Sequence, residues 1–244
     1  MSAELRVIPV EGMPEVREGD EVGALIAARA ELQDGDVVVI SQKVVSKAEG
    51  MVRRLAEIEP SSRAIELGKK LGKEAELVEL VLSESREVLR EERVLITETK
   101  HGFVCANAGI DSSNLPEEGT VCLLPTDPDA SARRIRAEFE STVAVVIADS
   151  FGRAWRVGQA EVAIGCAGLA ALDDWRGRHD ANGRELEATE IAIADQVAAA
   201  ADLVRAKDSG VPAAVIRGLD HYVSAEDGPG ATALRRHPSE DLFR

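Results

Sequence analysis

The stretch TVAVVIADSFGRAWRVGQ, residues 142–159, decides how the rest of the chain is read. Its first part, Thr142–Ala148, is the most strand-like run in the sequence, because a short continuous apolar segment is typical of a strand buried on both faces. The polar residues Asp149 and Ser150 follow it directly. We therefore expect these two residues to end a buried strand, where α/β proteins commonly place functional side chains.

Working outward from this strand, apolar runs and chain breakers predict a mixture of strands and helices. Strands and helices do not alternate strictly, which favours a mixed α/β (α+β) fold of two intertwined lobes over a Rossmann or P-loop fold. The strand-like runs are Leu5–Val10, Val37–Ile40, Val94–Thr97, Phe103–Ala106, Thr120–Leu124 and Val211–Ile216. The helix-like segments are Asp20–Leu32, Pro60–Leu71, Glu74–Leu82, Asp127–Phe139 and Ala188–Ala206. We expect residues 1–218 to form the functional unit and residues 219–244 to form a tail that packs on it or trails from it.

The composition limits the classes of protein to consider. The chain has 244 residues, of which 45% are hydrophobic and 30% charged, as is typical of a globular protein. A formal net charge of −15 argues against a general nucleic-acid or membrane-surface binder, since both need a basic face. The sequence has no signal-peptide pattern and no apolar run of membrane-spanning length. Its three cysteines form no CxxC pair, so we expect reduced thiols in a cytoplasmic protein.

Two polar segments in the first half of the chain could carry chemistry, although the GxxxxGK[ST] and GxGxxG nucleotide signatures are absent. In SQKVVSKAEG, residues 41–50, Lys43 and Lys47 are four residues apart and could hold phosphate oxygens. A solvated basic turn is the alternative. In NAGIDSSN, residues 107–114, Asp111 and the neighbouring amide oxygens suit a divalent cation. Here the alternative is an Asx-rich turn with only a local role.

Two further segments lie in the second half. After the strand at 142–148, the carboxylate of Asp149 and the hydroxyl of Ser150 form a pair that recurs at magnesium sites for phosphoryl transfer. Arg153 and Arg156 follow, and their guanidinium groups can bind phosphate or carboxylate in a bidentate way. The fourth segment, RAKDSGVPAAVIRG, spans residues 205–218. Its turn could hold a nucleotide by its backbone and Lys207, and Asp208 could assist a metal, unless it is a plain helix–strand connection.

These segments together resemble the coenzyme F420-0:L-glutamate ligase family, the gamma-glutamyl ligases of deazaflavin coenzyme biosynthesis. The motifs occur in the family's order: VIPVEGMPEVREGDEV, DGDVVVISQKVVSKAEG, NAGIDSSN, LLPTDPDASA, VIADSFGRAWRVGQ, IGCAGL, GRELEATEIAIADQVAAAADLV and VPAAVIRG. The resemblance runs from about Val7 to Gly218. The motif sequences are most similar to those of the ligase half of the bifunctional actinobacterial version. It implies a GTP-dependent acid–amino-acid ligase that forms a homodimer.

The resemblance also implies a set of site residues. GTP would contact Met13, Pro14, Glu15, Val16, Gln42, Lys43, Lys47 and Asn114, with Lys207 and Asp208 as candidates in the last nucleotide loop. Two divalent cations, magnesium or manganese, would be held by Asp111, Asp149 and Ser150, and potassium is a further candidate ion. The candidate catalytic residues are Asp111, Asp149 and Arg153. Lys207 stands where the last loop would otherwise be expected to supply an acidic or amide metal ligand.

The implied reaction joins L-glutamate to the coenzyme F420-0 precursor. GTP would phosphorylate a carboxylate to an acyl phosphate, the amine of glutamate would attack its carbonyl, and phosphate would leave. Phosphoryl transfer depends on charge neutralisation and positioning, which suits a chain with no evident Ser-His-Asp or Cys-His set. A related nucleotide-dependent ligase with another acceptor or amino acid, and a non-catalytic nucleotide-binding protein, are the alternatives.

Two expectations concern assembly and a second activity. The small apolar run Glu161–Leu172 is a candidate packing surface between subunits, and burial inside one subunit is the alternative. The bifunctional relatives continue into a flavin-binding reductase half, whereas this sequence stops at Arg244. The residues after Gly218 are too few, and too rich in charge, Gly and Pro, to build a flavin domain. We therefore expect no flavin binding.

Overall fold

The main lobe of the protein is built on a five-stranded mixed sheet. The computed structural model describes residues 4–241. The strand order is β1-β12-β2-β8-β9, and only the β2–β8 pair is parallel within this sheet. The strands span Arg6–Pro9 (β1), Val37–Ser41 (β2), Ala144–Arg153 (β8), Arg156–Ala167 (β9) and Ala213–Arg217 (β12). The first and last strands of the chain therefore pair at one edge of the sheet.

Helices cover both faces of this sheet. On one face, α1 (Val22–Ala27), α2 (Gln42–Ala48) and α5 (Pro128–Arg136) enclose one apolar cluster. On the other face, α6 (Ile193–Asp202) packs a second cluster. Every residue of the run Val37–Ile40 is fully buried, as expected for a central strand covered on both faces.

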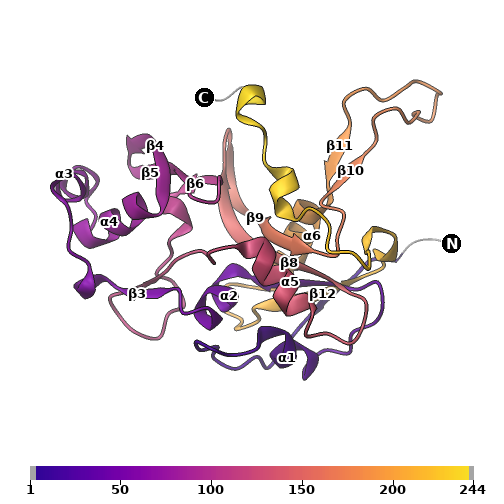
Figure 1. The fold of residues 1–244 in the computed structure, drawn as a ribbon, viewed down its shortest axis with the longest axis horizontal. Helices are drawn as coiled ribbons and strands as arrows, with labels where there is room; N and C mark the ends of the chain where they lie inside the picture. Colours follow the sequence, from indigo (N-terminus) through magenta and orange to yellow (C-terminus); the bar gives the residue numbers. More distant parts are fainter. Residues whose placement is uncertain (1–3, 242–244) are drawn as a thin grey trace.

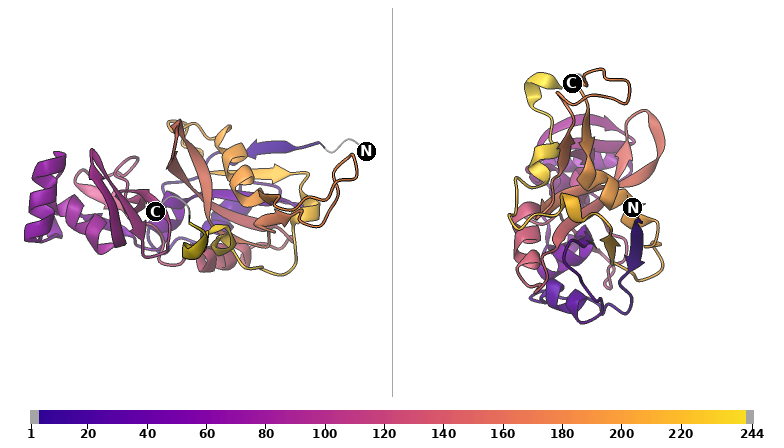
Figure 2. Two further views of the ribbon diagram at one scale, coloured as in Figure 1. Left: turned by 90° about the horizontal axis from the view of Figure 1, so that it is seen from above. Right: turned by 90° about the vertical axis from the view of Figure 1, so that its right-hand side faces the viewer.

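A second lobe is inserted into the first as one continuous segment, residues 52–122, between α2 and α5. It has its own apolar cluster, and it lies at one end of the elongated molecule (Figures 1 and 2). We call it the inserted lobe. Its strands pair only with one another, in the orders β3-β7 and β4-β5-β6. Its elements are β3 (Val52–Arg54), α3 (Ser62–Leu71), α4 (Ala75–Ser83), β4 (Ser85–Glu92), β5 (Val94–Thr99), β6 (Val104–Ala106) and β7 (Thr120–Cys122).

The remaining elements lie on the main lobe. The two-stranded ribbon of β10 (Leu172–Asp174) and β11 (Glu190–Ala192) carries a long projecting loop (Figure 1). The last described segment holds short 3-10 turns, and the buried Asp129 of α5 anchors one of them. Its carboxylate accepts hydrogen bonds from the backbone of Ala231 and Thr232 at 2.7 and 3.2 Å.

The mixed α/β class is confirmed, and several local predictions hold. Ser61 and Asp127 cap α3 and α5 through side-chain hydrogen bonds to Ala64 and Ala130. Gly72 ends α3 in the left-handed region, at φ 66°. No helix in the described part of the chain has the length and apolar character needed to cross a bilayer.

Two predicted helices are shorter than expected. The helix at 20–32 contains only Val22–Ala27, and Asp20 does not cap it because its carboxylate accepts from the backbone N–H of Arg17 at 2.8 Å. The helix at 188–206 is limited to Ile193–Asp202 because the residues before it form β11. In both cases non-local or turn pairing competes with the helical pattern.

The strand at 142–148 is longer than predicted. It continues through Asp149 and Ser150 to Arg153 because it pairs with β9 in a long hairpin, in which Ser150 lies opposite Glu161. The two polar residues therefore lie inside a strand rather than at its end. Polar letters alone do not end a strand whose partner continues beside it.

Candidate active site

A cavity of about 890 Å³ lies where the main and inserted lobes meet. It brings together segments that are far apart in the sequence. Of the predicted site residues it is lined by Met13, Pro14, Glu15, Val16, Gln42, Lys43, Lys47, Asp111, Asn114, Asp149, Ser150, Lys207 and Asp208.

Arg153 is the exception among the predicted site residues. It lies at the exposed tip of the β8–β9 hairpin, and its guanidinium donates to the backbone oxygen of Val157 at 2.7 Å. Arg156, three residues before Gln159 of β9, also lies outside the cavity. The structure therefore does not bring either arginine to the site, because β8 continues as a hairpin that carries them away.

One side of the cavity is built from α2 and the turn after β6. Since α2 begins at Gln42, Lys43 and Lys47 lie one turn apart on the same helix face. Gln42 is buried and donates to the backbone oxygen of Leu123 at 3.0 Å, which fixes the start of α2 against the segment that directly follows the inserted lobe. Both lysines are thereby aimed at the 111–114 turn.

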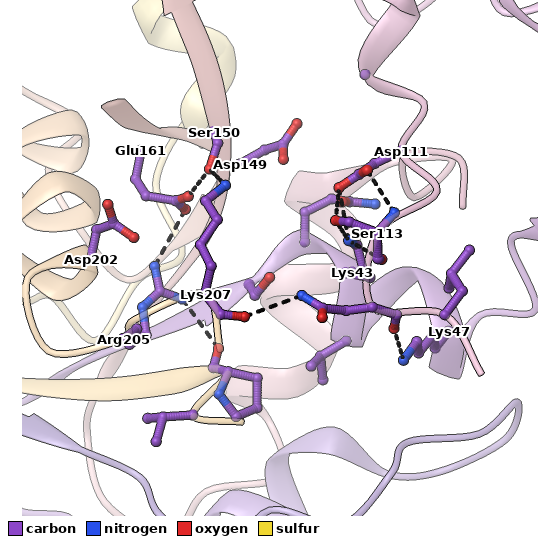
Figure 3. A pocket seen from close by; sticks show the side chains of 18 of the residues that line it. Lys43, Lys47, Asp111, Ser113, Asp149, Ser150, Glu161, Asp202, Arg205 and Lys207 are labelled. Atoms are coloured by element: carbon purple, nitrogen blue, oxygen red, sulfur yellow. Dashed lines mark hydrogen bonds and ion pairs between the residues drawn. The ribbon is translucent and has the colours of Figure 1, made fainter. Parts of the chain in front are cut away.

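The ammonium groups of these two lysines already have acidic partners. Lys43 Nζ lies 2.8 Å from a carboxylate oxygen of Asp111, and Lys47 Nζ lies 2.6 Å from one of Glu15. Lys47 also donates to the backbone oxygen of Asn114 at 3.1 Å. We refer to Lys43, Lys47, Glu15, Asp111 and Asn114 as the lysine wall (Figure 3 labels three of them). These partners are half exposed, so an entering phosphate could replace them.

The opposite side of the cavity is formed by β8, β9 and the turn after α6. The Ser150 hydroxyl donates to Glu161, and Lys207 Nζ donates to the Ser150 hydroxyl at 2.9 Å. The other carboxylate oxygen of Glu161 accepts from Arg205 at 3.3 Å. We refer to Ser150, Glu161, Arg205 and Lys207 as the serine wall (Figure 3).

The Glu161–Arg205 pair is deeply buried. Only 9% of the Glu161 side chain and 4% of the Arg205 side chain are exposed. Burial lowers the pKa of Arg205, with the charges of Glu161 and Asp202 opposing this effect. Arg205 also donates to the backbone oxygen of Pro212 at 3.1 Å, so it ties the turn before β12 to β9.

The two predicted metal-binding aspartates have opposite electrostatic environments. Burial raises the pKa of Asp149 to about 6, and the negative charges of Glu161 and Asp111 add to this increase. Burial also acts to raise the pKa of Asp111, but hydrogen bonds from Lys43 and Ser113 outweigh it and hold that pKa below its ordinary value. Asp149 therefore lacks the cationic partner that Asp111 has.

The roles of Glu161 and Arg205 are not evident from the sequence alone. Glu161 begins a mostly apolar run, and Arg205 begins a short polar turn. Recognition of the β8–β9 hairpin would have placed Glu161 opposite Ser150, and a buried carboxylate then needs a cationic partner. The run 161–172 itself is mostly buried against α5 and α6, so its apolar residues do not form an exposed packing surface.

The cysteines fit the expectation of free thiols. All three are buried and none forms a disulfide. Cys105 lines the cavity, and burial, with a contribution from the charge of Asp149, raises the pKa of its thiol to about 12. This thiol is therefore protonated at neutral pH and is a poor nucleophile.

Comparisons with known proteins extend the likeness to nearly the whole chain. Coenzyme F420:L-glutamate ligases from Archaeoglobus fulgidus and Methanothermobacter thermautotrophicus are 48% and 45% identical, each over 98% of this chain and 96% and 99% of their own lengths. The enzyme of the same name from Methanocaldococcus jannaschii is 41% identical over the full length of both chains. These relatives are archaeal proteins that align over nearly their whole lengths. They are not the bifunctional actinobacterial protein that the motif sequences suggested. A sequence model described as F420-0:Gamma-glutamyl ligase matches residues 12–218, and the chain therefore belongs to the F420-0:gamma-glutamyl ligase family.

Proposed function

We propose that this protein ligates L-glutamate to coenzyme F420-0 at the expense of GTP, forming an amide bond and then gamma-glutamyl bonds. The observation that carries the proposal is a single cavity lined by Lys43 and Lys47 of α2, by the aspartates Asp111 and Asp149, and by the loop at 13–16. The names of the relatives support the choice of glutamate and of the deazaflavin acceptor.

The proposed chemistry begins with activation of a carboxylate. A carboxylate oxygen of the acceptor attacks the γ-phosphorus of GTP, the bond from that phosphorus to the β–γ bridging oxygen breaks, and GDP leaves. The neutral amine of glutamate then attacks the acyl phosphate carbon, loses a proton, and expels inorganic phosphate. Both steps develop negative charge on phosphate oxygens, which positioned cations stabilise.

The lysine wall is the proposed phosphate site. Lys43 and Lys47 would exchange Asp111 and Glu15 for the phosphate oxygens of GTP, since both lysines are anchored on one face of α2. The loop at 13–16 and Asn114 lie at the same side and would contact the rest of the nucleotide. In the turn at 205–212, Lys207 and Asp208 line the cavity from the opposite side.

One divalent cation, magnesium or manganese, fits this cavity. The carboxylates of Asp111 and Asp149 both line it, and hard cations prefer such oxygen ligands. When bound, the cation would neutralise charge on the transferring phosphoryl group. A second cation on Ser150 does not fit equally well, because the Ser150 hydroxyl is already bonded to Glu161 and to the ammonium of Lys207.

We also infer a homodimer and one functional unit over residues 1–218, with the tail packed on it. Because the 161–172 run is buried, the exposed tip of the β8–β9 hairpin is the better candidate surface for a second copy of the chain. Trp155 and Val157 at this tip are 87% and 94% exposed. Light scattering should give a dimer mass for the wild type and a monomer mass for Trp155→Ser/Val157→Ser, while a monomeric wild type would rule the dimer out.

The function is tested with purified protein, F420-0, L-glutamate, GTP and magnesium. Mass spectrometry should show products that are heavier than F420-0 by glutamyl units, with GDP and phosphate released in equal amounts. A panel of other acceptors and amino acids, run in parallel, separates this activity from that of a related ligase. Release of phosphate without any heavier product, or no turnover under any nucleotide and metal condition, would refute the proposed function.

A further inference from the structure

The ammonium of Lys207 lies where a second cation would bind. Its Nζ donates to the Ser150 hydroxyl at 2.9 Å, on the cavity side of β8 (Figure 3). A magnesium ion on the same hydroxyl would lie about 2.1 Å from that oxygen. Two cations on one hydroxyl oxygen would repel each other at this short separation.

The position of Lys207 is fixed at both ends of the residue. Its backbone oxygen accepts a hydrogen bond from the Asn114 side chain at 3.4 Å, and its ammonium is held by Ser150. Lys207 thus connects the lysine wall with the serine wall (Figure 3). Lys207 is exposed, but these two contacts place its ammonium on Ser150 and its backbone beside Asn114.

The only other oxygen ligand close to Ser150 in the serine wall is also engaged. One carboxylate oxygen of Glu161 accepts from Ser150, and the other accepts from the buried Arg205. Recruiting Glu161 to a metal would leave the Arg205 charge without its partner in a site where it is 4% exposed, which is costly. The Ser150 hydroxyl and both carboxylate oxygens of Glu161 are therefore already bonded to protein groups, while Asp149 and Asp202 also line the cavity.

We propose that this protein binds one divalent cation, between Asp111 and Asp149, and that the Lys207 ammonium takes the place of a second one. The inference deepens the proposed function and rests on it for the metal site. Lys207 supplies a single positive charge and hydrogen-bond donors to the phosphoryl oxygens facing Ser150. Unlike a metal ion, this charge cannot be lost to dilution or to a chelator.

The test counts bound metal instead of product. Manganese is titrated into the protein with a saturating non-hydrolysable GTP analogue, and free manganese is followed by electron paramagnetic resonance. Wild type should bind one manganese per chain. Lys207→Gln removes the charge and should bind two, with the broadened spectrum of a coupled pair, since paired metals in such sites lie about 3.5–4 Å apart. The matched control Lys207→Arg keeps the charge and should bind one.

The possible results distinguish a failure of this inference from a failure of the proposed function. Two manganese ions per wild-type chain would overturn the inference while leaving the proposed function in place. A Lys207→Gln protein that still binds one ion would overturn it as well, because Lys207 would then not be what excludes the second. Wild type that binds no manganese would remove the metal site of the proposed function together with the inference. Thermal unfolding of each variant checks that the exposed substitution leaves the fold intact.

Discussion

The two walls of the cavity hold similar numbers of charges in different ways. On the lysine wall the acidic partners are accessible: the side chains of Asp111 and Glu15 are 49% and 56% exposed. On the serine wall the ion pair of Glu161 and Arg205 is 9% and 4% exposed. Exposed pairs contribute little to stability and exchange readily, whereas a buried pair is costly to break. The comparison indicates that one wall is an exchangeable ligand site and the other a fixed framework.

The largest expected effect is on stability. Glu161→Gln leaves the Arg205 charge unpaired and should lower the free energy of unfolding by about 3–5 kcal/mol. The matched change on the other wall, Glu15→Gln, removes the partner of Lys47 and should cost at most about 1 kcal/mol. Urea denaturation of both variants measures the difference. Equal losses would show that the two walls do not differ as described.

The next effect is on turnover. Asp111→Asn and Asp149→Asn should each lower the ligation rate at least ~100-fold at saturating magnesium, because each removes negative charge from the proposed cation site. Product formation by mass spectrometry measures the rate. Asp208→Asn, which changes a candidate nucleotide-contacting aspartate that is not one of the two proposed cation ligands, should lose less. Near wild-type turnover in either of the first two variants would show that the cation is misplaced.

A smaller effect should separate ground-state binding from catalysis. Lys47→Met removes an exchangeable phosphate partner and should raise KM for GTP about 10-fold, which corresponds to ~1.4 kcal/mol, with little change in kcat. Lys70→Met, on α3 of the inserted lobe and away from the cavity, should leave both parameters unchanged. Steady-state kinetics with varied GTP gives both. If Lys47→Met lowers kcat and leaves KM alone, the lysine wall acts in the transition state.

A further effect, of similar or smaller size, is a difference in sign between the two aspartates. The pKa of Asp149 is raised in the folded protein, so its ionisation opposes folding at pH 7, and Asp149→Asn should stabilise the metal-free protein by about 1–2 kcal/mol. This gain should shrink as pH falls through about 6 toward the unfolded value, where the wild-type carboxyl becomes protonated. This stability change is smaller than the free energy that corresponds to the full pKa shift, because Asp149 is partly exposed to solvent.

Asp111 should behave in the opposite way. Its folded pKa is depressed, so its carboxylate contributes stability above its unfolded pKa, and this contribution is lost as pH falls through the folded value. Asp111→Asn should therefore destabilise the metal-free protein at pH 7, by less than about 1 kcal/mol because the group is half exposed. Thermal melts of both variants at pH 7 and pH 4.5 test the pair. Shifts of the same sign would contradict the contrast between them.

The sequence predicted the strands and the site segments better than the connections between them. Buried strands such as Val37–Ile40 can be recognised by their uninterrupted apolar residues. Capped helices such as Ser62–Leu71 can be recognised by a serine before the helix and a glycine after it. The lysine wall was predictable because Lys43 and Lys47 have helical spacing and a nearby Asx-rich turn. In these cases the physical cause lies within a few residues.

The serine wall was not predictable in the same way. Glu161 and Arg205 are separated by 44 residues in the sequence, and Ser150 and Lys207 by 57. No local sequence pattern therefore predicts either contact. The hairpin that carries Arg153 away from the cavity depends on β9 continuing alongside β8. Such pairings are decided by non-local packing, which single-sequence patterns do not record.

The order in which the strands pair has a consequence for how the protein is made. Within the five-stranded sheet β1 pairs only with β12, so residues 6–9 have no strand partner until residues 214–217 have been made. The inserted lobe needs only residues 52–122 and can fold while the ribosome is still adding the second half of the chain. Until β12 emerges, the apolar strand β2 has an open edge that other nascent chains could join. Slow synthesis near residue 200 would therefore prolong the period in which this edge of β2 has no partner.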